Sequence, residues 1–97
     1  MNVTVVRIYL SERAHKHEKI FRLLHDREGV RGVTMFRGIS GFGHSGRIHG
    51  ASLLDLSLDL PVVIEFFDDP DKIEAVVADL RQVVEPEHIL TFPARLV

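Results

Sequence analysis

The sequence predicts a domain of the α+β class, with strands and helices in the order βαββαβ. Four segments alternate apolar and polar residues at period two, as strands do. Two further segments carry apolar residues at three- and four-residue steps, as amphipathic helices do. No clear helix separates the second and third strand segments, so these two are expected to form a hairpin with a long glycine-rich stretch in its connection.

The four strands are predicted from alternating β-branched and apolar residues. They cover residues 3–10, 30–37, 61–67 and 88–97. Pro61 is tolerated as the first residue of a strand, and Pro93 indicates that the last strand lies at an edge of the sheet. Residues 51–59 carry leucines at period two and are predicted to be extended, with one helical turn as the alternative.

The first helix is predicted over residues 13–28, where a narrow apolar stripe is flanked by basic residues. Ser11 offers an N-cap hydroxyl before it, and Gly29 is expected to end it. His15 and His17 lie two positions apart, so their rings are expected to point to nearly opposite sides of this helix.

The second helix has clear signals at both ends. Asp69 is an N-cap carboxylate with Pro70 at the first helical position, and Glu85 before Pro86 ends the helix. Each helix has a single apolar face, so both are expected to pack on one face of a four-stranded antiparallel sheet. This is the ferredoxin-like arrangement, and one such domain accounts for residues 1–97.

The face of the sheet without helices is expected to be both apolar and charged. The alternation places these residues on it: Val5, Arg7, Tyr9, Val33, Met35, Arg37, Val63, Glu65 and Phe67. This face is too apolar for water, so other copies of the chain are expected to cover it. The predicted oligomer interface contains Arg7, Tyr9, Met35, Glu65 and Phe67. Arg7 and Glu65 belong to strands that should be neighbours, and an ion pair between them is expected.

Composition narrows the classes of partner. The chain has no cysteine, which removes disulfides and thiolate metal sites. Its formal charge of −2 gives no overall attraction to nucleic acid or to an anionic membrane. No stretch reaches the length of a signal peptide or a membrane span. We therefore expect a cytoplasmic protein with no nucleic-acid partner and no direct membrane insertion.

Residues 37–50 differ most in composition from the predicted strands and helices. Five of the seven glycines lie there, together with Arg37, Arg47 and two histidines. A connection this long between two strands is uncommon and is usually functional or disordered. Successive glycine N–H groups can form a nest for an anion, and both arginines carry fork-shaped donors that suit phosphate or carboxylate. The composition indicates an anion-binding loop, with a merely mobile loop as the alternative.

Two sequence patterns in this stretch match phosphate-loop motifs, but neither lies in the structural context that its motif requires. Residues 41–46 spell G-x-G-x-x-G, but no helix opens after them as dinucleotide binding requires. Residues 38–45 spell G-x-x-x-x-G-H-S, with His44 where a phosphate-binding lysine should stand. The anion-binding expectation therefore rests on glycine and arginine chemistry and not on either motif.

The same stretch contains residues that could form a metal site or a hydrolase site. His44 and His49 could converge on a divalent metal, but no carboxylate or cysteine sits at ligand spacing with them. Ser40 or Ser45 beside one of these histidines is the arrangement that a small hydrolase would need, and it is common without chemistry. We expect no metal and no catalytic residue.

Three runs of residues resemble the PII-like domain-of-unknown-function family 190 (DUF190). They are GVTMFRGISGFG at 32–43, SGRIH at 45–49 and DLPVVIE at 59–65, and VRIYL at 6–10 fits the same pattern. The resemblance covers essentially the whole chain. It implies a ferredoxin-like fold, a homotrimer packed through its sheets, and kinship with PII signal-transduction proteins and CutA.

In PII proteins the loop between the second and third strands contacts partner proteins, and nucleotides bind at its base between subunits. Carried over by position, the loop is residues 38–49, and the implied ligand-binding residues are Arg37, Gly38, Ile39, Gly41, Phe42, Gly43, Arg47 and His49. The resemblance implies a non-catalytic sensor whose small anionic effector, with an adenine nucleotide as one candidate, controls a partner protein such as a membrane transporter. Residues 81–86 hold one basic residue where PII proteins place a nucleotide-gripping motif, so ATP itself is not implied. A CutA-like trimer that binds a divalent metal through His44 and His49 is the alternative.

Overall fold

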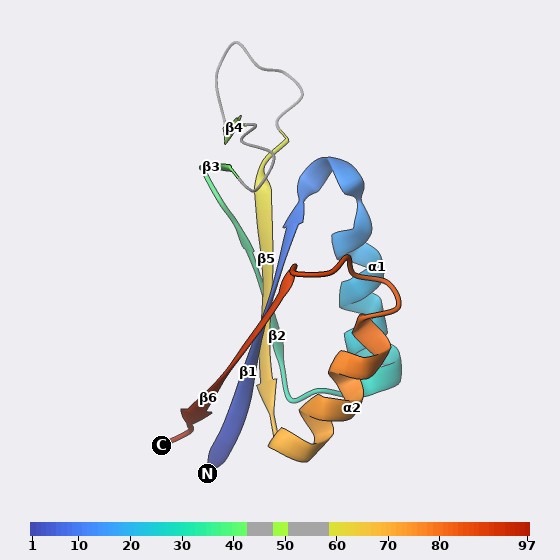
Figure 1. Cartoon of the computed structure of the whole chain (residues 1–97), viewed down its shortest axis with the longest axis vertical. Coiled ribbons are helices and arrows are strands. Elements are labelled where there is room, and N and C mark those ends of the chain that lie inside the picture. The colour runs from blue at the N-terminus through green and yellow to red at the C-terminus, as the bar shows by residue number, and fades with distance from the viewer. Residues whose placement is uncertain (43–47, 51–58) are drawn as a thin grey trace.

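The computed structural model describes residues 1–42, 48–50 and 59–97 of the chain (Figure 1). For residues 48–50 the description is of the backbone. Gly43, His44 and Arg47, and most of the segment 51–59 predicted to be extended, lie outside the described residues. The fold below is therefore that of the described ranges.

A four-stranded antiparallel sheet forms the centre of the fold. Its strands are β1 (Asn2–Ser11), β2 (Val33–Arg37), β5 (Pro61–Asp68) and β6 (Ile89–Arg95), in the order β2-β5-β1-β6. β2 and β5 are antiparallel neighbours, as the predicted hairpin requires. β6 lies at an edge, as Pro93 indicates, because proline cannot donate to a second neighbouring strand.

The first helical segment is more broken than its apolar stripe predicts. It consists of a 3₁₀ turn η1 (Glu12–Ala14), helix α1 (Lys16–Leu23) and a π-helical turn η2 (Leu24–Glu28). The interruption lies at His15, whose φ of 55° is left-handed. The predicted cap at Ser11 is wrong, since its side chain makes no capping hydrogen bond. Gly29, with φ of 57°, ends the segment as predicted.

The second helix, α2 (Pro70–Leu80), begins as the sequence predicts. The Asp69 carboxylate accepts a hydrogen bond of 3.0 Å from the Asp71 N–H. The helix ends earlier than expected, because residues 81–84 continue as turns and not as helix. In the described part of the chain, no helix combines the length and the apolar character that crossing a membrane requires.

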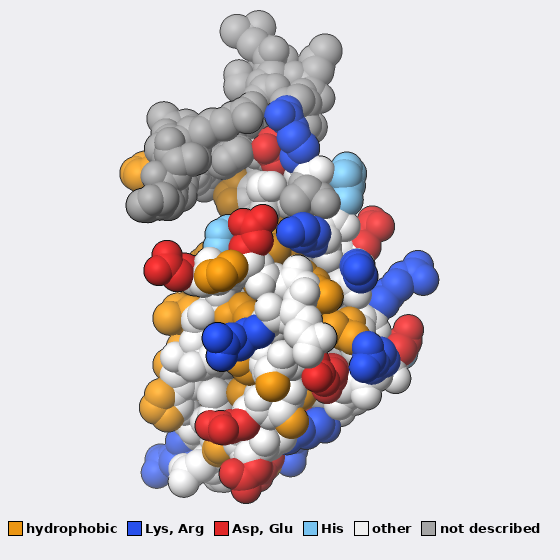
Figure 2. Space-filling view, turned by 45° about the vertical axis from the view of Figure 1, so that its right-hand side comes forward, with side chains coloured by type: hydrophobic (Ala, Val, Ile, Leu, Met, Phe, Trp, Pro, Cys, Tyr) orange, Lys and Arg blue, Asp and Glu red, His pale blue; other side chains and the backbone are white. Residues whose placement is uncertain are grey.

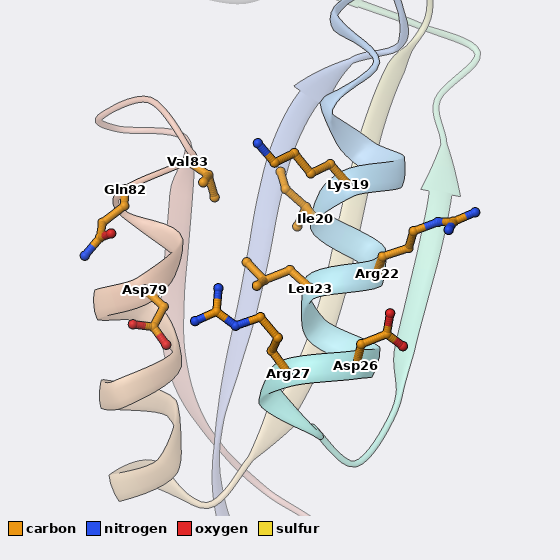
Figure 3. Close-up of a pocket in the computed structure, with 9 residues that line it drawn as sticks. All are labelled: Lys19, Ile20, Arg22, Leu23, Asp26, Arg27, Asp79, Gln82 and Val83. Carbon is orange, nitrogen blue, oxygen red and sulfur yellow. The ribbon is translucent and has the colours of Figure 1, made fainter.

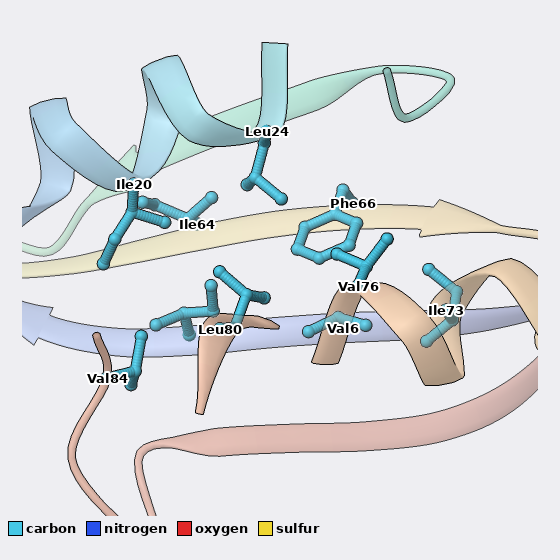
Figure 4. Close-up of a cluster of buried hydrophobic side chains, with 10 residues drawn as sticks. Val6, Ile20, Leu24, Ile64, Phe66, Ile73, Val76, Leu80 and Val84 are labelled. Atoms are coloured by element: carbon cyan, nitrogen blue, oxygen red, sulfur yellow. The ribbon is translucent and has the colours of Figure 1, made fainter. Parts of the chain in front are cut away.

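The core lies between the helices and one face of the sheet (Figure 4). Its buried side chains come from the central strands and from both helices: Val6, Ile8, Ile20, Leu24, Ile64, Phe66, Ile73, Val76, Leu80 and Val84. Both helices cover this face and leave the other face open (Figure 1). The ferredoxin-like prediction is confirmed in element order, sheet type and helix placement.

The strand register corrects the predicted faces of β2. Met35 lies opposite Ile64 and Arg37 opposite Val62, so both share the helix side of the sheet with the buried residues of β5. Val33, opposite Phe66, does the same. The placement of these residues on the open face was wrong because both faces of this edge strand are largely exposed, and alternation alone does not say which face is which.

The open face carries the ion pair that the sequence predicts. Arg7 Nε lies 2.9 Å from Glu65 Oε1, and these residues are direct cross-strand partners. The Arg7 guanidinium also lies 5.1 Å from the centre of the Phe92 ring. The hydrogen bond to Glu65 raises the pKa of Arg7 above its ordinary value. Tyr9, Phe36 and Leu90 are exposed apolar side chains on the same face.

Candidate functional site

The candidate site is the base of the glycine-rich stretch, where β2 leaves the sheet. Beyond Arg37 the chain forms β3 (Ser40–Phe42), which pairs antiparallel with β4 (Ile48–Gly50). Gly41 lies opposite His49 in this two-stranded ribbon, which sits past the end of the main sheet (Figure 1). The base of the stretch is therefore a paired ribbon, with a defined register on both sides of residues 43–47.

Two glycines hold the base of the stretch against Pro61. The Gly38 N–H donates a 2.8 Å hydrogen bond to the Pro61 carbonyl oxygen. A Cβ atom at Gly38 would lie 2.7 Å from Pro61 Cγ, and one at Gly41 would lie 3.3 Å from the same atom. At Gly38 a side chain would force the backbone or the proline ring to move, and at Gly41 it would fit only if the ring shifted by a few tenths of an ångström. At these two positions, glycine serves close packing against Pro61.

Arg37 is held beside this backbone by the carboxylate of Glu12. Arg37 Nη2 lies 2.8 Å from Glu12 Oε1 and 2.9 Å from Oε2, and Nε lies 3.2 Å from Oε2. The Arg37 side chain is 54% exposed and that of Glu12 is 29% exposed. A half-exposed pair of this kind contributes at most about 1 kcal/mol, so it can open at little cost.

A buried aspartate fixes the turn that carries Glu12. The Asp59 carboxylate accepts a 2.9 Å hydrogen bond from the Arg13 N–H, and its second oxygen lies 3.8 Å from Arg13 Nε. The Glu12 N–H donates to the Leu60 carbonyl at 2.8 Å. These bonds tie η1 to the chain just before β5. They place the Glu12 side chain within reach of the end of β2.

Two apolar side chains at the site point into solvent. Ile39 is 83% exposed and Phe42 is 73% exposed, and they flank Ser40 and Gly41. Exposure of this size lets the two side chains pack against an apolar or aromatic part of a ligand. With the Arg37 guanidinium, the site offers both a cation and apolar surface.

The structure brings together five of the predicted ligand-binding residues. Arg37, Gly38, Ile39, Gly41 and Phe42 are consecutive or nearly so at the end of β2 and along β3. His49 has its backbone opposite Gly41, while Gly43 and Arg47 lie outside the described residues.

Sequence reasoning missed Glu12 as part of this site. The signal that could have found it is topological. In an antiparallel sheet with β5 between β1 and β2, the carboxyl ends of β1 and β2 meet at the same end.

The histidines do not assemble a metal centre in the described part of the chain. Within those residues, no group of three or more His, Cys, Asp or Glu could hold a metal ion. The expectation that His15 and His17 face opposite sides holds only where both lie on one helix, and here His15 lies outside α1 and the two ring centroids are 6.4 Å apart. The reason is the left-handed backbone at His15, which precedes the first residue of α1. His44, part of the alternative metal site, lies outside the described residues.

A shallow groove of about 430 Å³ lies between the two helices, away from the candidate site (Figure 3). Its lining residues are Lys19, Ile20, Arg22, Leu23, Asp26, Arg27, Asp79, Gln82 and Val83. Basic and acidic side chains are interspersed along it and over the neighbouring surface (Figure 2). This mixture of charges gives no preference for one sign of ligand.

Solved structures share this fold. The chain matches CPII from Thiomonas intermedia K12, solved bound to ADP and bicarbonate, with a TM-score of 0.69 and 22% identity over 97% of this chain and 85% of that chain. It matches a PII-like signaling protein from Thermus thermophilus with a TM-score of 0.66 and 11% identity, over 97% of this chain and 86% of that one. The fold is therefore the PII-like version of the ferredoxin-like arrangement.

Sequence comparison gives the family. The model of the DUF190 family, described as "Uncharacterized ACR", matches residues 3–96. A UPF0166 protein of Aquifex aeolicus (strain VF5) is 36% identical over 82 residues, which are 84% of this chain and 83% of that protein. A UPF0166 protein of Methanocaldococcus jannaschii is 34% identical over 88 residues, covering 84% of this chain and 78% of that protein. The chain belongs to the DUF190 family, as its glycine-rich run indicates.

Proposed function

We propose that this protein is a non-catalytic, PII-like regulatory protein that binds a small anionic effector at the base of its glycine-rich stretch. One observation carries the proposal. The Arg37 guanidinium lies half-exposed where β2 leaves the sheet, beside glycines packed on Pro61. The fold around it is shared with CPII, which was solved with ADP and bicarbonate.

An adenine nucleotide is the candidate effector. The Arg37 fork suits a phosphate group, and backbone N–H groups of the glycine-rich stretch can add donors. The exposed side chains of Ile39 and Phe42 offer apolar surface for a base. We include Gly43, Arg47 and His49 in the proposed site by their position in the family run.

The proposal places the effector in clefts between the subunits of a homotrimer. Exposed apolar side chains on the open face, among them Tyr9 and Phe36, support burial of that face by further copies. Arg7, Tyr9, Glu65 and Phe67 remain our proposed interface residues. Met35 lies on the helix side, so Phe36 replaces it as the contribution of β2 to this face.

Oligomeric state has a direct measurement. Light scattering on the purified protein should give about three times the chain mass of 11.0 kDa. A single species at the mass of one chain would contradict the covered face.

The proposed output is a change in partner binding. An effector at the loop base would favour one arrangement of residues 38–49 and so alter the affinity for a partner, for which we propose a cytoplasmic setting and a membrane transporter as a candidate. The proposal contains no catalytic step. Nucleotide turnover that is lost in His49→Ala would replace it with a hydrolase.

Calorimetric titration with ADP tests the site. Arg37→Ala should weaken binding by at least about ten-fold, because a charge-assisted hydrogen bond contributes roughly 1.5–3 kcal/mol. Arg47→Ala is the second variant. Arg22→Ala, which removes the same charge from the groove between the helices, is the matched control and should bind normally. Normal binding by both loop variants would remove the proposed site.

A further inference from the structure

We infer that Glu12 is a specificity-determining residue of the effector site, which disfavours anions more strongly the more negative charge they carry. The inference rests on the proposed function, because it needs an anion bound at Arg37. It names a class of effector: an anion of low charge, such as a nucleoside mono- or diphosphate, ahead of a triphosphate.

The first step is that Glu12 already occupies the donors an anion would use. Its two carboxylate oxygens contact Nε and Nη2 of Arg37 at 2.8 to 3.2 Å. An anion that takes this edge of the guanidinium must displace the carboxylate. This exchange cost is the same for every ligand, so it lowers all affinities together.

The second step is that the displaced carboxylate cannot leave the site. The backbone of its turn is tied to the chain before β5 by the Glu12 N–H bond to Leu60 and the Arg13 N–H bond to Asp59. The negative charge of Glu12 therefore stays within a side-chain length of any anion bound to Arg37. Its other neighbour, Arg13, is paired with the buried Asp59.

The third step is that this repulsion grows with ligand charge. Two unit charges 4 to 8 Å apart in water repel by about 0.5 to 1 kcal/mol, which is roughly two- to five-fold in affinity per negative charge. Displacement thus lowers every affinity equally, while repulsion lowers the affinity for ATP more than for ADP, and that for ADP more than for AMP. A carboxylate at position 12 thereby biases the site toward effectors of low charge.

The test measures three ligands that share a nucleoside and differ in charge. Dissociation constants for AMP, ADP and ATP are determined without divalent metal, at one ionic strength, for the wild type and Glu12→Gln. Glutamine keeps the size of the side chain and one of its two acceptor oxygens, and it removes the charge. Glu85→Gln is the matched control, since Glu85 belongs to an exposed ion pair with Lys16 at 3.6 Å.

The expected result is a graded gain. Glu12→Gln should bind all three nucleotides more tightly, with the gain rising by roughly two- to five-fold for each added negative charge. The gradient should shrink as salt is raised, because exposed charges are screened. Glu85→Gln should leave the ratios between the three nucleotides unchanged. Thermal unfolding of both variants confirms that they are folded.

Other outcomes separate the two proposals. If Arg37→Ala loses binding while Glu12→Gln gives an equal gain for all three nucleotides, or none, the inference fails and the effector site stands. A control variant that shifts the ratios as much as Glu12→Gln does would also overturn the inference. If Arg37→Ala alone binds all three nucleotides normally, the inference fails, because it needs an anion bound at Arg37. If Arg37→Ala and Arg47→Ala both bind normally, or neither wild type nor Glu12→Gln binds any nucleotide, the proposed site fails and the inference fails with it.

Discussion

Strand β5 has a buried carboxylate near each end, Asp59 just before it and Asp68 as its last residue, with exposures of 7% and 5%. Each accepts a hydrogen bond from a backbone N–H of another segment, Arg13 at one end and Arg31 at the other. Each is also paired with the side chain of that same arginine. The two ends of the sheet therefore use the same chemistry to tie connecting segments to β5.

At the Asp68 end of the sheet, called the closed end below, cations and N–H donors surround the buried carboxylate. Lys72 Nζ lies 3.3 Å from Asp68 and donates a 2.7 Å hydrogen bond to the Gly29 carbonyl at the end of the first helical segment. Burial by itself raises the pKa of the Asp68 carboxyl. The hydrogen bonds from the Asp69 N–H, Lys72 and the Arg31 N–H outweigh it and lower the pKa below its ordinary value. The cations and N–H donors at this end are used in holding the fold together.

The Asp59 end has a further pair beyond its buried carboxylate. Glu12 and Arg37 form a contact that is half-exposed on the arginine side, and the chain continues past it into the glycine-rich stretch. Buried pairs are costly to break, whereas exposed pairs exchange readily. The Asp68 end is therefore held by pairs around a buried carboxylate, whereas the Asp59 end also carries an exposed pair, which can open more readily.

The largest expected effect is at the closed end. Asp68→Asn should lower the free energy of unfolding by about 2–3 kcal/mol, because it leaves buried N–H donors and two cations without their carboxylate. Urea denaturation at fixed protein concentration measures it. Glu85→Gln, which removes an exposed pair, should cost less than about 0.5 kcal/mol. Equal costs for the two variants would contradict the distinction between buried and exposed pairs.

The same variant should change the response to acid. Since the pKa of Asp68 is lowered in the folded state, its stabilisation is present above the ordinary value of 3.8 and is lost as the pH falls through the folded pKa. Asp68→Asn should flatten this acid limb of the stability curve. An unchanged acid limb would show that Asp68 is not held as a paired carboxylate.

The next effect is at the Asp59 end of the sheet, where the base of the glycine-rich stretch packs closely on Pro61. Gly38→Ala should cost about 1–3 kcal/mol, because its Cβ would meet Pro61 Cγ at 2.7 Å. Gly32→Ala is the control near the opposite end of β2, where a Cβ would meet no heavy atom within 4 Å. It should change stability by less than about 0.5 kcal/mol. Thermal unfolding of both variants compares them, and equal losses would show that the base of the stretch does not pack on Pro61.

The smallest effect tests a second carboxylate at the closed end. Burial and a hydrogen bond with Asp79 raise the pKa of Glu28 above its ordinary value of 4.5. The pair therefore stabilises the fold while one proton is shared, and this stabilisation is lost as the pH rises through the raised pKa. Asp79→Asn should raise stability at pH 7 by up to about 0.5 kcal/mol and flatten this slope. Urea denaturation from pH 4 to 7 measures it, and a steeper slope in the variant would contradict the shared proton.

The sequence predicts strand positions, helix starts and cross-strand contacts correctly where the signal is local or lies in two neighbouring strands. Pro93 located an edge strand, Asp69 with Pro70 located a helix start, and alternation in two central strands led to the Arg7–Glu65 pair. These succeed because each feature depends on short-range chemistry or on strands buried on one face.

The errors arise where long-range geometry decides. The register against β5, and not the alternation of β2, puts Arg37 and Met35 on the helix side. The break at His15 results from its left-handed backbone conformation, which the apolar stripe of the helix does not predict. Glu12 reaches Arg37, 25 residues further along the chain, only because the ends of β1 and β2 meet at one end of the sheet. The residues of the glycine-rich run can be found from local sequence, whereas the carboxylate beside Arg37 follows only from the topology of the sheet.

NMR amide spectra of the isotope-labelled protein, recorded during an ADP titration, test the central claim. That claim is that the effector binds at the Asp59 end of the sheet, at the base of the glycine-rich stretch. The account predicts that the N–H signals of Gly38 and Gly41, together with the Nε–H signal of Arg37, shift as ADP is added. The N–H signals of Gly29 and Gly32, at the closed end, should stay in place. Shifts confined to the closed end or to the groove between the helices, or no shifts at all, would contradict it.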